Sequence, residues 1–105
     1  MRSPRYSGKR KKPKLLLVRR VAGLSMQPAL RPGRLLLATG LFASVKPGQV
    51  VIVRHGDIEK VKRVQRVREG QIFVVGDNEK VSVDSRSFGW LPVESVIAKV
   101  IWPQL

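Results

Sequence analysis

The sequence predicts a small, mostly β fold, an antiparallel sheet or partly open barrel that follows a basic N-terminal arm. Three observations predict it: short apolar or β-branched runs recur along the chain, turn signals separate them, and no stretch shows a helical period. A length of 105 residues is enough for one domain. We place the disordered arm at residues 1–14 and the folded domain at residues 15–105.

Six runs are typical of strands, and Gly- or Pro-containing turns lie between consecutive runs. The runs cover residues 15–19, 34–38, 50–54, 59–67, 71–75 and 95–101. The run at 59–67 is irregular, because Val61, Val64 and Val67 recur at every third residue, whereas strand alternation places one face at every second. The pattern therefore leaves open which face of that strand is buried.

Positive charge is concentrated in the arm. The chain has a formal net charge of +14, and nine of its 21 basic residues lie among the first 20 residues, which include no acidic residue. The stretch at 8–14, GKRKKPK, has no apolar face to bury, so we expect it to be disordered. Its readable property is attraction to anionic lipid or nucleic acid, and a solubilising tail is the alternative.

Composition excludes several kinds of site. The absence of cysteine rules out disulfides, thiolate catalysis and thiolate metal sites. A single histidine, His55, argues against a histidine metal centre, so we expect neither a metal nor another cofactor. The longest apolar runs, at 15–18 and 35–38, are far shorter than the roughly 18 residues of a membrane span, and we therefore expect a soluble, cytoplasmic protein.

One serine raises the question of catalysis. In GLSMQPALRPG, residues 23–33, Ser25 stands between a leucine and a methionine, and a serine hydroxyl is a poor nucleophile until a base removes its proton. His55 is one candidate base, and Lys60 and Lys62 are two others, since serine–lysine pairs are a known solution. A histidine in a turn and lysines in a strand are ordinarily surface residues, so these residue types alone leave the choice open.

Three segments taken together resemble the signature boxes of type I signal peptidases. They are SMQPAL at 25–30, KRV at 62–64, and GDN at 76–78 followed by SVDSRSFG at 82–89. The last box is the most specific, and the likeness extends from about Val18 to the C-terminus. The short, anchor-free members, such as the maturation proteases of nickel-type superoxide dismutase, are the most similar. The resemblance implies a serine endopeptidase on the β fold of the signal peptidase catalytic core.

The resemblance also implies the catalytic roles. Ser25 matches the nucleophile, and Lys62 matches the general base because the family's lysine is followed directly by arginine, which sets Lys60 aside. The supporting positions are a hydroxyl that orients the lysine amine, a pair that braces the site and a structural turn, namely Ser82, Asp84 with Arg86, and Gly76, Asp77 and Asn78.

Further positions concern the substrate and the oxyanion. The Ser25 N–H is expected to bind the oxyanion, and Gly23 stands where some members carry a serine hydroxyl, so we expect a backbone N–H as the second donor. Met26 and Pro28 match substrate-contacting positions. A free lysine titrates near ~10.4, so burial has to favour the neutral amine of Lys62 before it can act as a base.

The substrate expected from this resemblance is a precursor protein bound as an extended strand, with small residues before the cut. Ala29 and Gln49 depart from the family pattern, and the short interval between Lys62 and Gly76 leaves no room for the extra β-domain of many members. Because the sequence has no apolar run long enough for a membrane span, we expect leader removal from a soluble precursor such as nickel superoxide dismutase. The first alternative is signal peptide processing at an anionic membrane that residues 2–20 contact.

Two other classes rank lower. A self-cleaving switch similar to LexA shares the serine and lysine chemistry, but the segment at 1–22 is too short and too charged for a DNA-binding domain. A non-enzymatic basic β-module that binds nucleic acid would account for the arm. However, the aromatic residues do not alternate with the basic ones along the sequence as a stacking surface would require.

Overall fold

The computed structural model describes residues 14–105 and shows one antiparallel sheet of seven strands. The strands are β1 (Leu17–Arg20), β2 (Leu35–Thr39), β3 (Val50–His55), β4 (Ile58–Arg68), β5 (Gln71–Val75), β6 (Leu91–Pro92) and β7 (Val96–Trp102), with a short helix α1 (Ser85–Phe88) and a 3-10 turn η1 (Val93–Ser95). The strand order is β1-β2-β7-β3-β4-β5-β6, and the sheet does not close. The predicted fold class is therefore confirmed.

All six expected strands are present, each shifted by at most a few residues. Sequence analysis did not predict α1, β6 or η1, because elements of two to four residues are too short to show a period. The predicted arm at 1–14 lies outside the described residues except for Lys14, whose carbonyl oxygen accepts a hydrogen bond from the Gly40 N–H at 2.8 Å. The boundary between arm and domain remains a prediction.

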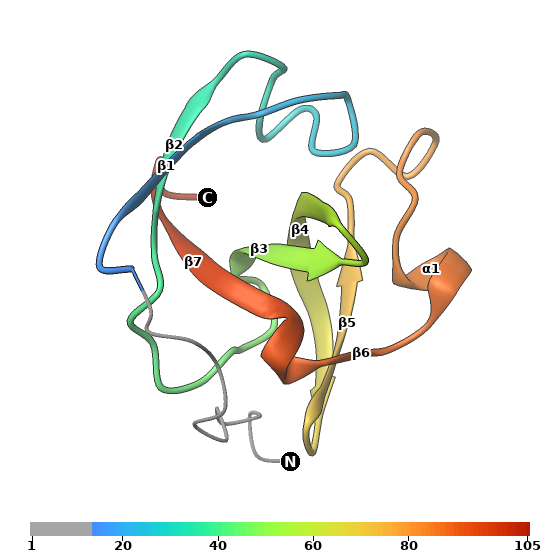
Figure 1. Ribbon diagram of the computed structural model, residues 1–105. Coiled ribbons are helices and arrows are strands. Elements are labelled where there is room, and N and C mark those ends of the chain that lie inside the picture. The colour runs from blue at the N-terminus through green and yellow to red at the C-terminus, as the bar shows by residue number, and fades with distance from the viewer. Residues whose placement is uncertain (1–13) are drawn as a thin grey trace.

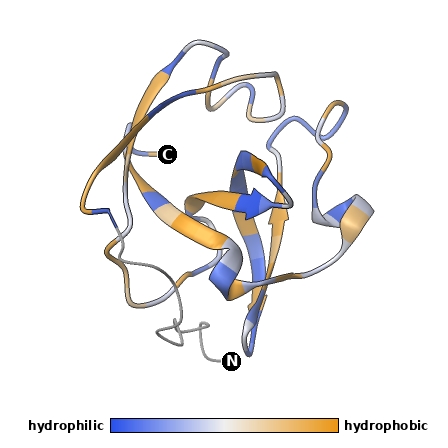
Figure 2. Cartoon of the chain, viewed as in Figure 1, coloured by the Kyte–Doolittle hydropathy of each residue, from blue (hydrophilic) through white to orange (hydrophobic). Residues whose placement is uncertain are grey.

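β3 lies near the middle of the sheet (Figure 1), and its first four residues are buried, with side chains on both faces. Val51 and Val53 belong to the core cluster formed with β4, β5 and η1. Val50 and Ile52 face the other way, into a second cluster formed with β1, β2 and the loop after β1. This double burial accounts for the continuous VVIV run, which colours the first part of β3 as hydrophobic in Figure 2, whereas the end of the strand is hydrophilic. Strands that are covered on both faces typically have such continuous apolar runs.

A β-bulge in β4 explains the valine spacing that the sequence left ambiguous. The register with β5 shifts between Val64 and Arg66, which inserts one extra residue, Gln65. Val64 and Val67 therefore share a face and both belong to the cluster around β5, although they are three residues apart. Val61 precedes the bulge and packs against the other cluster.

The loop that carries Ser25 is anchored to the core by its neighbours. Met26 and Leu30 are each only 1% exposed and pack in the cluster beneath β1 and β2, and the Leu30 N–H donates to the Met26 carbonyl at 2.8 Å. In Figure 1 this loop arches over the top of the sheet toward the loop that follows β5. Burial of two large side chains thus fixes a segment that has no regular secondary structure.

Candidate active site

A groove of about 470 Å³ lies between the end of β1 with its following loop and the strand β4. Ser25 and Lys62 both line this groove. Apolar side chains from the loop, from β3 and β4 and from the segment after β5 form much of its surface, including Val21, Leu24, Met26, Ile52, Val61, Val81 and Val83. The groove therefore combines an apolar wall with the two residues that the sequence singled out.

The backbone of Ser25 is held by the turn that follows β5. The Asn78 N–H donates to the Ser25 carbonyl oxygen at 2.7 Å. Gly76 lies against the same carbonyl: a Cβ at this position would be 2.6 Å from the Ser25 oxygen and would collide with the Ser82 side chain. Position 76 therefore requires a glycine, because no other residue has space there. The backbone of Gly76 lies close to both the Ser25 carbonyl oxygen and the Ser82 side chain.

The backbone donors around Ser25 are open. Within residues 14–105, neither the Gly23 N–H nor the Ser25 N–H donates a hydrogen bond. Gly23 adopts a φ of 77°, a left-handed conformation that favours glycine, and it lies on the groove wall. Two unused N–H groups beside a serine hydroxyl are what an oxyanion hole needs.

Lys62 is a buried lysine, with 4% of its surface exposed. Strand alternation places it on the same face of β4 as Val64, and its partner across the sheet is the fully buried Val51. Its Nζ donates to the Ser82 Oγ at 2.9 Å. In the described chain, Lys62 makes no hydrogen bond with the Ser25 hydroxyl.

Burial lowers the pKa of Lys62 below its ordinary value. The carboxylate of Asp84 opposes this effect, and the nearby charges of Lys60 and Arg86 add to the lowering. The net direction favours the neutral amine, which is the form that carries a lone pair.

Asp84 is the centre of the supporting network and is fully buried. Its carboxylate accepts hydrogen bonds from the Ser82 hydroxyl at 2.5 Å, from the Gly76 N–H at 2.8 Å, and from the Arg86 backbone N–H and guanidinium. Burial by itself would raise the pKa of Asp84, but these hydrogen bonds outweigh it and hold the pKa well below its usual range. The same carboxylate caps the N-terminus of α1.

The Ser82 hydroxyl has a fixed direction as a result. It donates its proton to Asp84, so its lone pairs face Lys62 and accept an N–H from the amine. When the amine is neutral, an N–H directed to Ser82 leaves the nitrogen lone pair to point elsewhere. The chain Arg86–Asp84–Ser82 thus orients Lys62.

Sequence reasoning did not single out Arg63 as a site residue. Its Nε and terminal nitrogen donate to both oxygens of Asp77, each at 2.9 Å, and its other terminal nitrogen donates to the Gly48 carbonyl at 2.8 Å. Asp77 precedes Asn78, whose N–H holds Ser25. Strand alternation could have indicated a separate role for Arg63, because the side chains of adjacent residues in a strand, here Lys62 and Arg63, point to opposite faces.

The competing bases are directed elsewhere. Lys60 Nζ lies 3.5 Å from His55 Nδ1 and 4.9 Å from the centre of the Phe88 ring. The His55 ring itself stacks on Phe88, with a centroid distance of 4.2 Å. These contacts join the β3–β4 hairpin to α1 and do not involve Ser25.

The expected substrate contacts differ in exposure. Met26 lines the groove, but its side chain is buried in the core, so it contributes to the floor. Pro28 is exposed and borders a separate hollow with Gln27 and residues 77–80. Within residues 14–105, no group of three side chains is suited to hold a metal ion.

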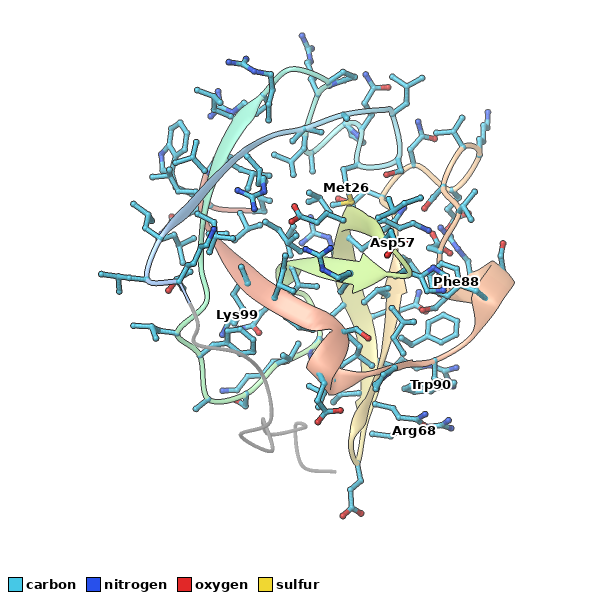
Figure 3. All side chains as sticks on the ribbon, viewed as in Figure 1. Met26, Asp57, Arg68, Phe88, Trp90 and Lys99 are labelled. Carbon is cyan, nitrogen blue, oxygen red and sulfur yellow. The ribbon has the colours of Figure 1, made fainter. Side chains whose placement is uncertain are left out.

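A second feature appears only in three dimensions, on β4, β5 and the segment before β6. Arg68 lies over the Trp90 ring at 4.0 Å, and Arg66 contacts both Trp90 and Phe73 at 5.5 and 5.3 Å. Figure 3 shows Trp90 and Arg68 close together on the side of the molecule that also carries Phe88. The basic and aromatic side chains that are not interleaved in sequence therefore meet in space.

The comparison with known families identifies the chain's relatives. Residues 53–105 match the family described as Signal peptidase, peptidase S26, and the chain belongs to this family. It is also 43% identical over 49 residues to the signal peptidase I of Bacillus caldolyticus. That match covers 44% of this chain and 27% of the relative, so the chain spans well under half of the relative's length.

The family match covers only part of the candidate site. It includes Lys62, Ser82, Asp84 and Arg86 and begins after Ser25. Among the described residues there is no helix with the length and apolar character needed to cross a membrane.

Proposed function

We propose that this protein is a serine endopeptidase that uses Ser25 and Lys62 to remove an N-terminal leader or signal segment from a precursor protein. The observation that carries the proposal is the buried Lys62 amine, which is oriented by Ser82 and lines the same groove as Ser25. Membership of the signal peptidase family supports hydrolysis of a peptide bond as the reaction.

The reaction begins with proton transfer. Lys62 Nζ takes the proton of the Ser25 hydroxyl as the serine oxygen attacks the scissile carbonyl. The negative charge that develops on the carbonyl oxygen is stabilised by the Ser25 N–H and by the N–H at Gly23. The Lys62 ammonium then gives its proton to the leaving amine, and the acyl group stays on Ser25.

Water completes the cycle. Lys62, neutral again, removes a proton from a water molecule that attacks the acyl-enzyme, and the leader is released with a free carboxylate. Hydrogen bonds in an unliganded site are often long and tighten when substrate binds, so the Ser25–Lys62 contact is expected to close when a peptide fills the groove and excludes water.

The expected substrate lies extended along the groove with small residues before the cut. The favoured substrate is a soluble precursor, such as a nickel superoxide dismutase, processed in the cytoplasm. The second candidate is signal peptide processing of exported proteins, which the name of the Bacillus relative favours. In that case residues 2–20 would hold the protein at an anionic membrane surface.

The nucleic acid alternative gains nothing from the cluster around Trp90. Bases bind such surfaces by stacking on free aromatic faces, whereas arginine side chains already cover Phe73 and Trp90. We therefore keep it as the least favoured function.

Cleavage of synthetic leader peptides, followed by mass spectrometry, tests the proposal. Ser25→Ala and Lys62→Ala should each abolish cleavage, while Lys60→Ala and His55→Ala should retain most of it. A serine-directed covalent probe should label the parent but not Ser25→Ala. An inactive His55→Ala together with an active Lys62→Ala would mean that the dyad is wrong.

Sedimentation with vesicles of anionic lipid separates the two settings. Arm-driven binding should weaken as salt rises above physiological ionic strength and should be lost when residues 1–14 are deleted. Binding that survives both changes would refute the peripheral membrane setting. Failure to process any leader of a soluble precursor would count against the cytoplasmic one.

A further inference from the structure

An ion pair joins the two walls of the groove at a distance from Ser25. Arg19 of β1 donates through Nε to Glu59 Oε1 of β4 at 2.8 Å and through a terminal nitrogen to Oε2 at 3.3 Å. β1 and β4 are not neighbours in the sheet, so no backbone ladder connects them here. Both side chains line the groove, and their ion pair bridges it.

The position of this ion pair along β4 determines which residue of an extended substrate it can contact. Glu59 stands three residues before Lys62 in the same strand, which corresponds to about 10 Å at the usual rise of a β-strand. An extended substrate has nearly the same rise per residue. If the substrate residue beside Lys62 is counted as the first, three steps along the peptide therefore bring the fourth residue to Arg19 and Glu59.

The charge at the bridge is not balanced. Arg54 also contacts Glu59, at 3.4 Å, so two guanidinium groups share one carboxylate and the formal charge of the three groups is positive. Arg20 and Lys60, which also line the groove, have the same sign. A substrate side chain that reaches this end of the groove therefore meets a cationic surface.

We propose that the part of the substrate before the cut lies along the groove from Lys62 toward Glu59, and that the Arg19–Glu59 ion pair closes this end and selects substrates with an acidic side chain, and against a basic one, at about the fourth residue before the cut. This inference rests on the proposed peptidase function. It makes Arg19 and Glu59 specificity-determining residues that are separate from the catalytic pair. Because Arg19 and Glu59 are 36% and 29% exposed, solvent screens the effect, and we expect a modest preference.

Three peptides that differ only at this fourth residue, with Glu, Gln or Lys, test the inference. For the parent protein, kcat/KM should be about five-fold higher with Glu than with Lys at low salt, and the ratio should shrink as salt is added. A second set, with the same exchange at the fourth residue after the cut, serves as the control for direction.

Two variants make the prediction specific to charge. Arg19→Gln removes one positive charge and should bring the Glu/Lys ratio toward one, whereas Glu59→Gln removes the negative charge and should increase the ratio. Both variants break the same ion pair, so a purely structural role would change both in the same direction. Arg31→Gln, at an exposed arginine outside the groove, is the matched control and should leave the ratio unchanged.

The outcomes separate this inference from the function on which it rests. If the parent cleaves none of the peptides, the proposed function fails. If all peptides are cleaved with a ratio near one in the parent and in both variants, the selection by Arg19 and Glu59 is wrong. A charge preference that appears only after the cut would overturn the assigned direction of the substrate.

Discussion

The sharpest test of the proposal that Lys62 is a buried base concerns stability. Replacing Lys62 by methionine keeps a side chain of similar length beside Val51 and Val64 but removes the amine. The Lys62→Met variant should be inactive in the peptide assay and yet unfold at a higher temperature than the parent. The physical reason is that the parent buries a group whose charged form burial disfavours.

The magnitude follows from three contributions. Each unit by which burial lowers the pKa of Lys62 corresponds to about 1.4 kcal/mol of destabilisation, and that destabilisation disappears with the amine. The variant loses the hydrogen bond to Ser82, about 1 kcal/mol, but Ser82 keeps its bond to Asp84, so no buried polar group is left without a partner. Methionine has as many apolar heavy atoms as the stem of lysine, so the third contribution, the burial of apolar surface, changes little. The burial cost that is removed is expected to exceed the hydrogen bond that is lost, so the net effect is a stabilisation.

The stability difference between Lys62→Met and the parent should depend on pH. Below the lowered pKa of folded Lys62, the amine is charged in both states and its burial cost is fully present. Above the ordinary value of 10.5, the amine is neutral in both states and the cost is absent. The advantage of Lys62→Met should therefore be greatest at neutral pH and below, and should shrink as the pH rises toward 10.5.

Thermal unfolding followed by circular dichroism between pH 6 and 10.5 measures this difference. A gain of 1 kcal/mol corresponds to a rise of roughly 4 to 8 °C for a domain of this size. Lys60→Met is the matched control, because it removes the same group two residues away on the same strand, and its melting temperature should not rise. A drop of about 4 °C or more in Lys62→Met at neutral pH would show that Lys62 is instead a charged, structurally paired residue.

Three further substitutions test the supporting network. Gly76→Ala should destabilise the fold by about 1–3 kcal/mol and impair cleavage, because the new Cβ has no space beside Ser25 and Ser82. An unchanged free energy of unfolding in urea would show that the methyl group fits there. Asp84→Asn should cost about 2–3 kcal/mol, since a buried charge pair is broken beside a partly exposed arginine. The Asp84→Asn variant also removes the carboxylate whose charge raises the pKa of Lys62. The pH profile of any remaining activity should therefore move to lower pH, and a shift to higher pH would contradict this role of Asp84. Arg63→Lys loses the bidentate contact with Asp77. This variant should have a lower kcat in kinetic assays and an unchanged fold by calorimetry. Full activity would mean that the contact does not position Ser25.

The sequence by itself determined the layout of strands and turns. The β-branched runs and the Gly- and Pro-containing turns between them are local signals, and each expected strand is present. The family resemblance likewise depended only on the order and content of short segments, and the family match confirmed it. The assignment of Ser25 and Lys62 as a catalytic pair follows from that resemblance and stays a prediction.

Only the tertiary structure decided how those segments meet. The bulge at Gln65 sets which side chains of β4 share a face beyond it, and one inserted residue is invisible to a pattern that assumes regular alternation. The bridge from Arg19 to Glu59 and the clamp of Arg63 on Asp77 join residues far apart in the chain. Such contacts depend on the order of strands and the curvature of the sheet. They also make Lys62 unlike Lys60: two lysines on one face of one strand differ because one is enclosed by the core and the Ser82–Asp84 network, while the other reaches the hairpin end beside His55.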